Sequence, residues 1–318
     1  MTERGGANGE RGPAKRPEIR LFGPLSIEDG ERRIGPSQLG GARPKQVLEI
    51  LLTARGHRVP LDRLAELLWP EERPQNVPGS LQTFVSTLRR HLTPDRERAR
   101  QFVVTENEAY RFATDLAWLD LDRFDELLER SAHEPTSQAR ASLEEALILV
   151  RGEVLEDEPY ATWALDVRSS YQGRVLGARL DAADAALAEF DFAPALVHAE
   201  AAAALDRFSE RAYRTGMLAL YALGRPHEAL SRYRAFRMRL DEELGLEPAQ
   251  DTRALESAIL RQEDVHSLLP RRNVRPEAEN GHSAVRLLGL EPELELLIWS
   301  NTPPMSAPPG HALHSRRH

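Results

Sequence analysis

An internal repeat in the second half of the chain limits what this sequence can fold into more than any other feature. The pairs Ala195-Leu196 and Ala229-Leu230 stand 34 residues apart, and each follows a turn-like stretch, Asp191 to Pro194 and Gly224 to Glu228. A fixed period of this length predicts stacked helix pairs, each packed against its neighbours. From Leu119 onward Ala, Leu, Glu and Arg dominate, a composition typical of helices.

The 34-residue period is that of the tetratricopeptide repeat (TPR), so residues 119–262 are predicted to form an all-α, TPR-like domain. Small alanines let paired helices approach closely, and Tyr233 and Phe236 have the size that fills the space between repeats. Stacked helix pairs build concave surfaces that bind proteins or peptides. Residues 263–318 are Pro-rich and predicted to be largely disordered, as is an arm at residues 1–17.

Residues 18–115 carry the pattern of a winged helix. The sequence predicts a strand at 19–27, a turn at 28–31, helices at 44–54, 61–69 and 80–92, and a hairpin with strands at 102–105 and 110–112. A strand, three helices and a hairpin follow each other in this order in a winged helix-turn-helix preceded by a small sheet. The predicted fold class is therefore mainly α, with an α+β winged helix followed by an all-α domain.

The third of these helices has two contrasting faces. At about 100° per residue its apolar stripe holds Leu81, Val85, Leu88 and Leu92. The other side carries polar or positive side chains and no acidic one: Gln82, Thr83, Ser86, Thr87, Arg89 and Arg90. The stripe predicts the buried side, and the polar side is left for a ligand. Pro78-Gly79 at the entry is expected to shorten the first turn.

Charge is divided unevenly along the chain. The net charge is −8, but residues 1–115 carry 19 Lys and Arg against 16 Asp and Glu, whereas residues 116–318 carry 23 against 34. Phosphate binding depends on local charge, so the first part suits nucleic acid and the acidic remainder suits protein partners. An asymmetry of this size also arises by chance, so it supports a function only together with motifs.

The sequence lacks the motifs of an enzyme. It has no cysteine, which excludes disulfides, thiolate zinc sites and iron–sulfur clusters. No phosphate loop, dinucleotide fingerprint or serine elbow occurs, and His227-Glu228 is followed by Ser231 where a zinc protease needs its second histidine. We expect no catalytic residue, no metal and no cofactor. Without an apolar leader or a long aliphatic run, the chain is expected to be cytoplasmic, with no membrane contact.

Several motifs, in a consistent order, resemble one family of bacterial regulators. They are Phe22 to Leu25, Arg43 to Gln46, Leu61 to Pro70, Leu81 to Leu92, Leu121 to Leu127 and Arg232 to Pro248. Over about residues 19–262 they resemble the Streptomyces antibiotic regulatory proteins (SARPs), in which an OmpR-like winged helix precedes a bacterial transcriptional activation domain (BTAD). The resemblance implies a sequence-specific DNA-binding activator that recruits RNA polymerase to secondary-metabolite or other pathway genes.

The resemblance also implies roles for individual residues. The third helix would lie in the major groove. The side chains that would read bases there are Gln82, Thr83, Ser86 and Thr87, and those that would reach phosphate or guanine are Arg89 and Arg90. The DNA backbone would be held by Lys45, Gln46 and Trp69. The minor groove would be entered by Arg111. The implied partners are double-stranded DNA with a direct-repeat promoter site, the sigma and alpha subunits of RNA polymerase, and a second copy as a homodimer, at least on DNA.

Some of these residues have a competing interpretation. Trp69 suits core packing at least equally well, and Arg89, about 70° from the centre of the stripe, suits a carboxylate partner. The hairpin turn carries Glu106 and Glu108, which repel phosphate. The alternative function is therefore a TPR-type interaction or sensor protein whose winged helix binds protein instead of DNA. Arg90, opposite the stripe, is the strongest candidate for a DNA contact.

Overall fold

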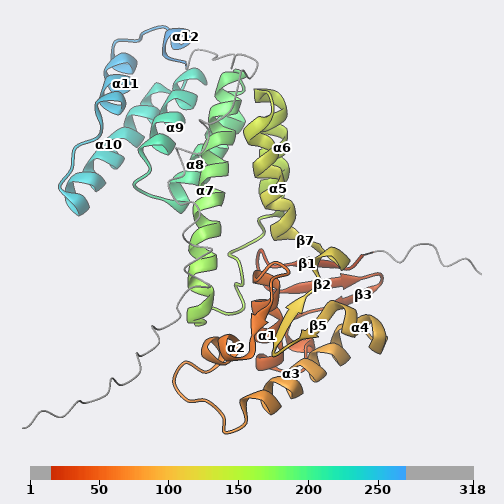
Figure 1. The fold of residues 1–318 in the computed structure, drawn as a ribbon. Helices are drawn as coiled ribbons and strands as arrows, with labels where there is room; N and C mark the ends of the chain where they lie inside the picture. Colours follow the sequence, from red (N-terminus) through yellow and green to blue (C-terminus); the bar gives the residue numbers. More distant parts are fainter. Residues whose placement is uncertain (1–15, 270–318) are drawn as a thin grey trace, which may run out of the picture. The chain divides into compact units, whose positions relative to one another are not determined.

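The computed structural model describes residues 16–269 (Figure 1). We call residues 16–119 the winged-helix part and residues 120–269 the helical part. Most of the predicted arm and most of the predicted C-terminal tail lie outside the described residues. The tail prediction is tested only at its beginning, where a short helix, α12 (Val265–Leu268), is present.

The strand predicted at residues 19–27 is in fact two strands. β1 (Glu18–Arg20) and β2 (Ser26–Asp29) pair antiparallel, and the chain reverses between them at Gly23, whose φ of +93° is a conformation that favours glycine. β3 (Arg32–Ile34) pairs with β2, and β7 (Trp118–Leu119) pairs parallel with β1. The single-strand prediction is wrong because the apolar residues continue through the turn, where they are buried as well.

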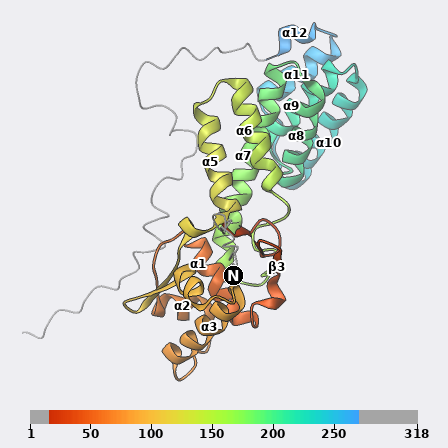
Figure 2. The ribbon, with the colours of Figure 1, turned by 90° about the vertical axis from the view of Figure 1, so that its right-hand side faces the viewer.

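The three predicted helices are α1 (Ala42–Thr53), α2 (Leu61–Leu68) and α3 (Val77–Leu92), which cluster together in both views (Figures 1 and 2). A 3-10 turn at Pro36–Gln38 precedes α1. α3 begins a turn earlier than predicted, because Pro78 fits the first turn and Asn76 caps it by accepting the Gly79 amide at 2.9 Å. The expected shortening at Pro78-Gly79 is therefore wrong.

The predicted second hairpin is present as the wing. β5 (Val103–Glu106) and β6 (Ala109–Phe112) pair antiparallel, and β4 (Val59–Pro60) adds to β6. Between α3 and the wing lies α4 (Arg96–Phe102), a helix that the sequence pattern does not predict. Asp95 caps it by accepting the amides of Glu97 and Arg98 at 2.9 and 3.2 Å. A second 3-10 turn, at Thr114–Leu116, leads to β7.

The helical part is a stack in which each helix packs against the next (Figures 1 and 2). Its helices are α5 (Asp120–His133), α6 (Thr136–Leu149), α7 (Leu165–Ala188), α8 (Phe192–Leu205), α9 (Glu210–Ala222), α10 (Pro226–Leu244) and α11 (Gln250–Leu260), with a 3-10 turn at Thr162–Ala164. Ala195 of α8 and Ala229 of α10 are both wholly buried, one repeat apart. The predicted TPR-like stack is confirmed. None of the described helices combines the length and apolarity needed to cross a bilayer.

One hydrophobic core runs through both parts. Phe22, at the turn between β1 and β2, packs against Phe124 of α5 and Tyr171 of α7, with ring centroids 5.1 and 5.6 Å apart. Val154, in the segment between α6 and α7, bridges to Phe22. Asp120, at the start of α5, is almost wholly buried and accepts the Phe22 amide at 2.9 Å. The helical part therefore completes the core of the winged-helix part.

Candidate DNA-binding surface

Helix α3 buries the predicted stripe and exposes most of the predicted polar face. Leu81, Val85, Leu88 and Leu92 are at most 6 % exposed, which confirms the stripe. Four side chains on the other side are exposed: Gln82, Thr83, Ser86 and Arg90. α3 contains no acidic residue. Its outer face therefore suits the hydrogen-bonding edges of bases and the negative charge of phosphates.

Arg90 is an arginine of α3 that no carboxylate neutralises within residues 16–269. Its guanidinium contacts Thr87 Oγ1 at 3.5 Å, and its side chain is exposed. Thr87 itself is half-buried, because the turn before α1 lies against it. Gly40 in this turn has a φ of +85°, and a Cβ there would overlap the Thr87 methyl group. Thr87 therefore lies at the edge of the exposed face.

Arg89 is engaged by the wing. Its Nε and Nη2 donate to the Val103 carbonyl at 3.1 and 2.6 Å, and Nη2 also donates to Thr105 Oγ1 at 2.8 Å. Burial lowers the pKa of its guanidinium. No carboxylate pairs with Arg89 among the described residues, so its partner is the β5 backbone and not the acid considered from sequence. These contacts join α3 to the wing and engage the Nε and Nη2 donors of Arg89.

The wing presents two arginines beside one carboxylate. Arg111 Nε lies 2.7 Å from Glu106 Oε1, and Arg58 Nε lies 4.0 Å from the other Glu106 oxygen. The Arg58 side chain is 63 % exposed, against 32 % for Arg111. Arg58 was not predicted from the sequence. It directly precedes β4, which is only two residues long and therefore shows no alternating pattern of a strand. Arg58, the more exposed of the two, and Arg111 therefore share one carboxylate partner.

Trp69 is part of the core between α2 and α3. Its ring lies 5.9 Å from that of Phe84, and the Arg43 guanidinium stands over it at 6.0 Å. Arg43 also donates to the Leu68 carbonyl at 2.6 Å. The half-buried indole is therefore a packing residue in this structure, which favours the core interpretation over a contact with the DNA backbone.

Lys45 and Gln46 face the helical part. Lys45 is 6 % exposed, and its Nζ lies 2.6 Å from Asp157 and 2.7 Å from Glu158. The Gln46 side-chain amide donates to Glu158 at 2.8 Å. Buried cations require such partners. The side chains of both residues are therefore engaged with the segment between α6 and α7 and do not belong to the exposed face of α3.

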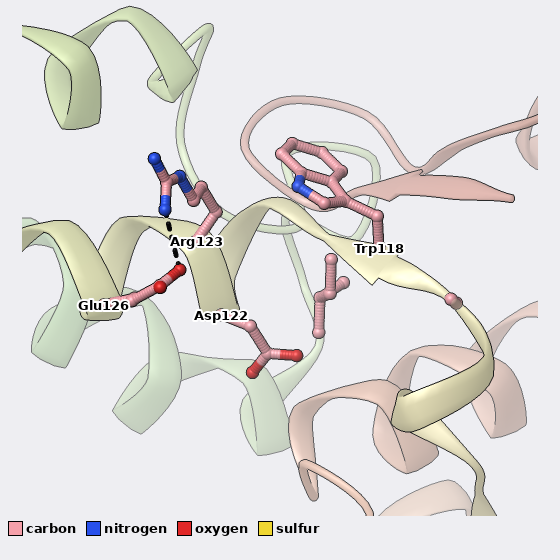
Figure 3. Close-up of a pocket in the computed structure, with 6 residues that line it drawn as sticks. Trp118, Asp122, Arg123 and Glu126 are labelled. Atoms are coloured by element: carbon pink, nitrogen blue, oxygen red, sulfur yellow. Dashed lines mark hydrogen bonds and ion pairs between the residues drawn. The ribbon is translucent and has the colours of Figure 1, made fainter. Parts of the chain in front are cut away.

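An open depression of about 310 Å³ lies where β7 meets α5 (Figure 3). Arg123 lines it and is paired with Glu126 at 2.8 Å, the contact dashed in Figure 3, and with Glu145 at 2.6 Å. Asp122 is paired with Arg55 at 3.0 Å. The charged groups that line the depression, Asp122, Arg123 and Glu126, therefore already have partners within the described part of the chain.

Comparison with known proteins places the chain in a family. Transcriptional regulatory protein MoaR1 of Mycobacterium tuberculosis is 29 % identical over 80 % of this chain and 82 % of its own length. Transcriptional regulator RedD of Streptomyces coelicolor is 30 % identical over 78 % of this chain and 71 % of its own length. The chain belongs to the SARP family of transcriptional regulators. The resemblance found in the motifs is thereby confirmed.

Two further comparisons agree with the SARP architecture. The family model described as a bacterial transcriptional activator domain matches residues 119–260, which is most of the helical part. The solved structure of Mycobacterium tuberculosis EmbR in complex with a low affinity phosphopeptide matches with a TM-score of 0.68 at 26 % identity, over 79 % of this chain and 67 % of that chain. This SARP is therefore a transcription regulator and not an enzyme.

Proposed function

We propose that this SARP is a sequence-specific DNA-binding transcriptional activator. The observation that carries the proposal is the outer face of α3, which is polar and free of acidic residues. It includes the exposed Arg90, which pairs with no carboxylate among residues 16–269. The buried stripe on the opposite side holds this face outward. Directional donors and acceptors beside a free cation are what direct reading of base edges requires.

In this proposal α3 lies in the major groove, the usual site of the second helix of a helix-turn-helix. Gln82, Thr83 and Ser86 read base edges, and Arg90 contacts guanine or a phosphate. Arg58 and Arg111 of the wing reach toward the adjacent minor groove, where arginine is favoured by the negative potential. Arg89 holds the wing against α3 and so sets the distance between the two contacts.

The helical part supplies the activation step in this proposal. It contacts the sigma and alpha subunits of RNA polymerase and pairs with a second copy of the chain on a direct-repeat promoter in the cytoplasm. Three observations support this role: the match to a transcriptional activator domain, the acidic charge of residues 116–318, and the TPR-like stack. Stacked helix pairs suit protein partners, and their acidic surface disfavours DNA.

The test is Arg90→Ala in the full-length chain, with a duplex that the wild-type chain selects from a random-sequence library. Because Arg90 is exposed and opposite the stripe, the variant is expected to melt like wild type. A lost guanine contact weakens binding by about 1–3 kcal/mol, and a lost phosphate contact lowers the salt slope by about one. Arg253→Ala removes an exposed arginine from α11 and is the charge-matched control.

Binding equal to wild type at every salt concentration would remove α3 from the DNA surface. In vitro transcription with purified polymerase then tests activation on the same site. The second candidate is an interaction protein whose winged helix binds protein, and the pairing of Glu106 with the wing arginines favours it. A full-length chain that selects no duplex from the library would support that candidate.

A further inference from the structure

Lys45 lies in the junction between the two parts and is surrounded by carboxyl groups. Its Nζ lies 2.6 Å from Asp157, 2.7 Å from Glu158 and 3.6 Å from Glu49. Only one other lysine, Lys15, occurs among the 42 basic residues of the chain. A single buried ammonium group therefore attaches α1 to the segment between α6 and α7.

The segment that receives Lys45 is itself held in place. Arg168, buried on α7, donates to three backbone carbonyls of residues 154–158. Asp157 accepts the amide of Leu25, from the winged-helix part, at 3.1 Å. The Asp157 and Glu158 carboxylates are therefore positioned by α7 and by the backbone of both parts, and they form a fixed acceptor for the Lys45 ammonium.

Helix α1 connects this junction with α3. The two helices pack directly on each other and share one core, and the turn before α1 approaches α3 closely at Gly40. At the other end of α1, Arg55 lies 3.0 Å from Asp122 and 2.5 Å from Asp125 of α5. Closely packed helices transmit a displacement instead of absorbing it. A shift of α1 at the junction therefore shifts the face that α3 presents.

We propose that Lys45 is a positioning residue for DNA recognition. By pairing with Asp157 and Glu158 it fixes α1, and through α1 the helix α3, relative to the helical part. The inference rests on the proposed DNA binding by α3. In this role Lys45 does not contact the DNA backbone, which is the contact that the family resemblance implies for it. DNA binding and closure of the junction, by which we mean the pairing of Lys45 with Asp157 and Glu158, are then linked, and each stabilises the other.

A positioning role and a direct phosphate contact make opposite predictions. If Lys45 touched phosphate, its loss would lower the salt slope by about one. Neutralising Asp157 would then strengthen binding, because it removes a negative charge that repels DNA. If Lys45 positions α3, the salt slope stays unchanged and Asp157→Asn weakens binding as Lys45→Met does. The sign of the Asp157→Asn effect therefore separates the two roles.

The experiment uses the full-length chain and its selected duplex. Lys45→Met and Asp157→Asn are each expected to weaken binding by roughly 2- to 30-fold, the range for residues that couple two sites. Glu153→Gln, on the same segment, removes an exposed carboxylate and is the matched control, expected to bind at least as tightly as wild type. Thermal melting identifies folded variants, and Glu158→Gln is the replacement if one of the first two is unfolded.

Reductive methylation, read by mass spectrometry, measures the junction directly because the chain has only two lysines. Asp157→Asn is expected to raise the rate of Lys45 methylation several-fold relative to Lys15. The selected duplex is expected to slow Lys45 methylation in the wild-type chain more than a scrambled duplex does, because DNA binding and junction closure are linked.

Three results would overturn the inference and leave the proposed function intact. They are a salt slope lowered by about one in Lys45→Met, an Asp157→Asn variant that binds as tightly as Glu153→Gln, and a Lys45 methylation rate that Asp157→Asn does not change. A wild-type chain that selects no duplex overturns the proposed function, and the inference with it.

Discussion

Glu49 is the side chain of α1 that its surroundings accommodate least well. It is wholly buried, and neither carboxyl oxygen has a hydrogen-bond partner among residues 16–269. Burial and the negative charge of Asp157 raise the pKa of Glu49 to about 9, while Lys45 acts in the opposite direction. Glu49 is therefore protonated near neutral pH. Three carboxyl groups, those of Asp157, Glu158 and Glu49, thus surround the single Lys45 ammonium of the junction.

Glu49→Gln is expected to stabilise the folded chain, and increasingly so as the pH rises. The folded state keeps the Glu49 proton up to about pH 9, whereas the unfolded chain releases it above about pH 4.5, so wild-type stability falls across that interval. The amide does not titrate. Between about pH 6 and pH 8 its advantage in the free energy of unfolding should grow by about 2–3 kcal/mol. Denaturant titrations that show the same difference at both pH values would rule out a protonated Glu49.

At the scale of elements, Arg89 attaches the wing to α3, and Glu106 offsets part of the positive charge of the wing arginines. The Val103 carbonyl and the Thr105 hydroxyl accept from Arg89, so the base of β5 is fixed on the helix. Toward its tip, Glu106 pairs with Arg111 and lies near Arg58. The wing is therefore fixed beside α3, and a DNA phosphate would have to compete with Glu106 for its two arginines.

Glu106→Gln is expected to tighten DNA binding and to steepen its salt dependence. Removing the carboxylate frees Arg111 and Arg58, and each phosphate that they then contact adds about one to the salt slope. Fluorescence anisotropy with the selected duplex at increasing salt measures both quantities. Glu129→Gln, on α5, is the control for net charge. An affinity and slope equal to those of the control would show that the wing lies off the DNA.

At the scale of the whole molecule, the winged-helix part is completed by residues that follow it in the chain. β7 pairs with β1, Asp120 accepts the Phe22 amide, and Val154 bridges to Phe22. Leu21 and Leu25, both wholly buried, belong to the core that includes residues of α5, α6 and α7. The two parts are therefore expected to depend on each other for stability.

The full-length chain is expected to unfold in a single cooperative transition, with circular dichroism and tryptophan fluorescence changing together. A chain cut after residue 115 lacks β7, Asp120 and Val154, so it should melt at lower temperature, or not fold, and bind hydrophobic dyes. A chain cut after residue 269 keeps every described element and should melt like the full-length chain. Two separate transitions in the full-length chain would show that the parts fold independently.

The sequence by itself determined the features that depend on neighbouring residues. The stripe from Leu81 to Leu92 and the repeat that places Ala195 and Ala229 are periodic, and a period of 3.6 or 34 residues is visible without any partner. The motifs in their order also indicated the family. The exposed face of α3 could also be predicted from the sequence, because the polar face of an amphipathic helix lies opposite its apolar stripe.

The tertiary structure alone decided what the side chains in the first turn of α1 contact. Arg43 to Gln46 has the composition of a DNA contact, but the carboxylates of Lys45 are Asp157 and Glu158, and Asp157 is 112 residues away. A buried cation is stable only where the fold brings such partners to it, and no local pattern reveals a partner at that distance. The break at Gly23 has the same cause, because Phe22 is buried against Phe124 and Tyr171 of the helical part. Long-range packing thus decided which basic side chains are paired within the chain and which are exposed.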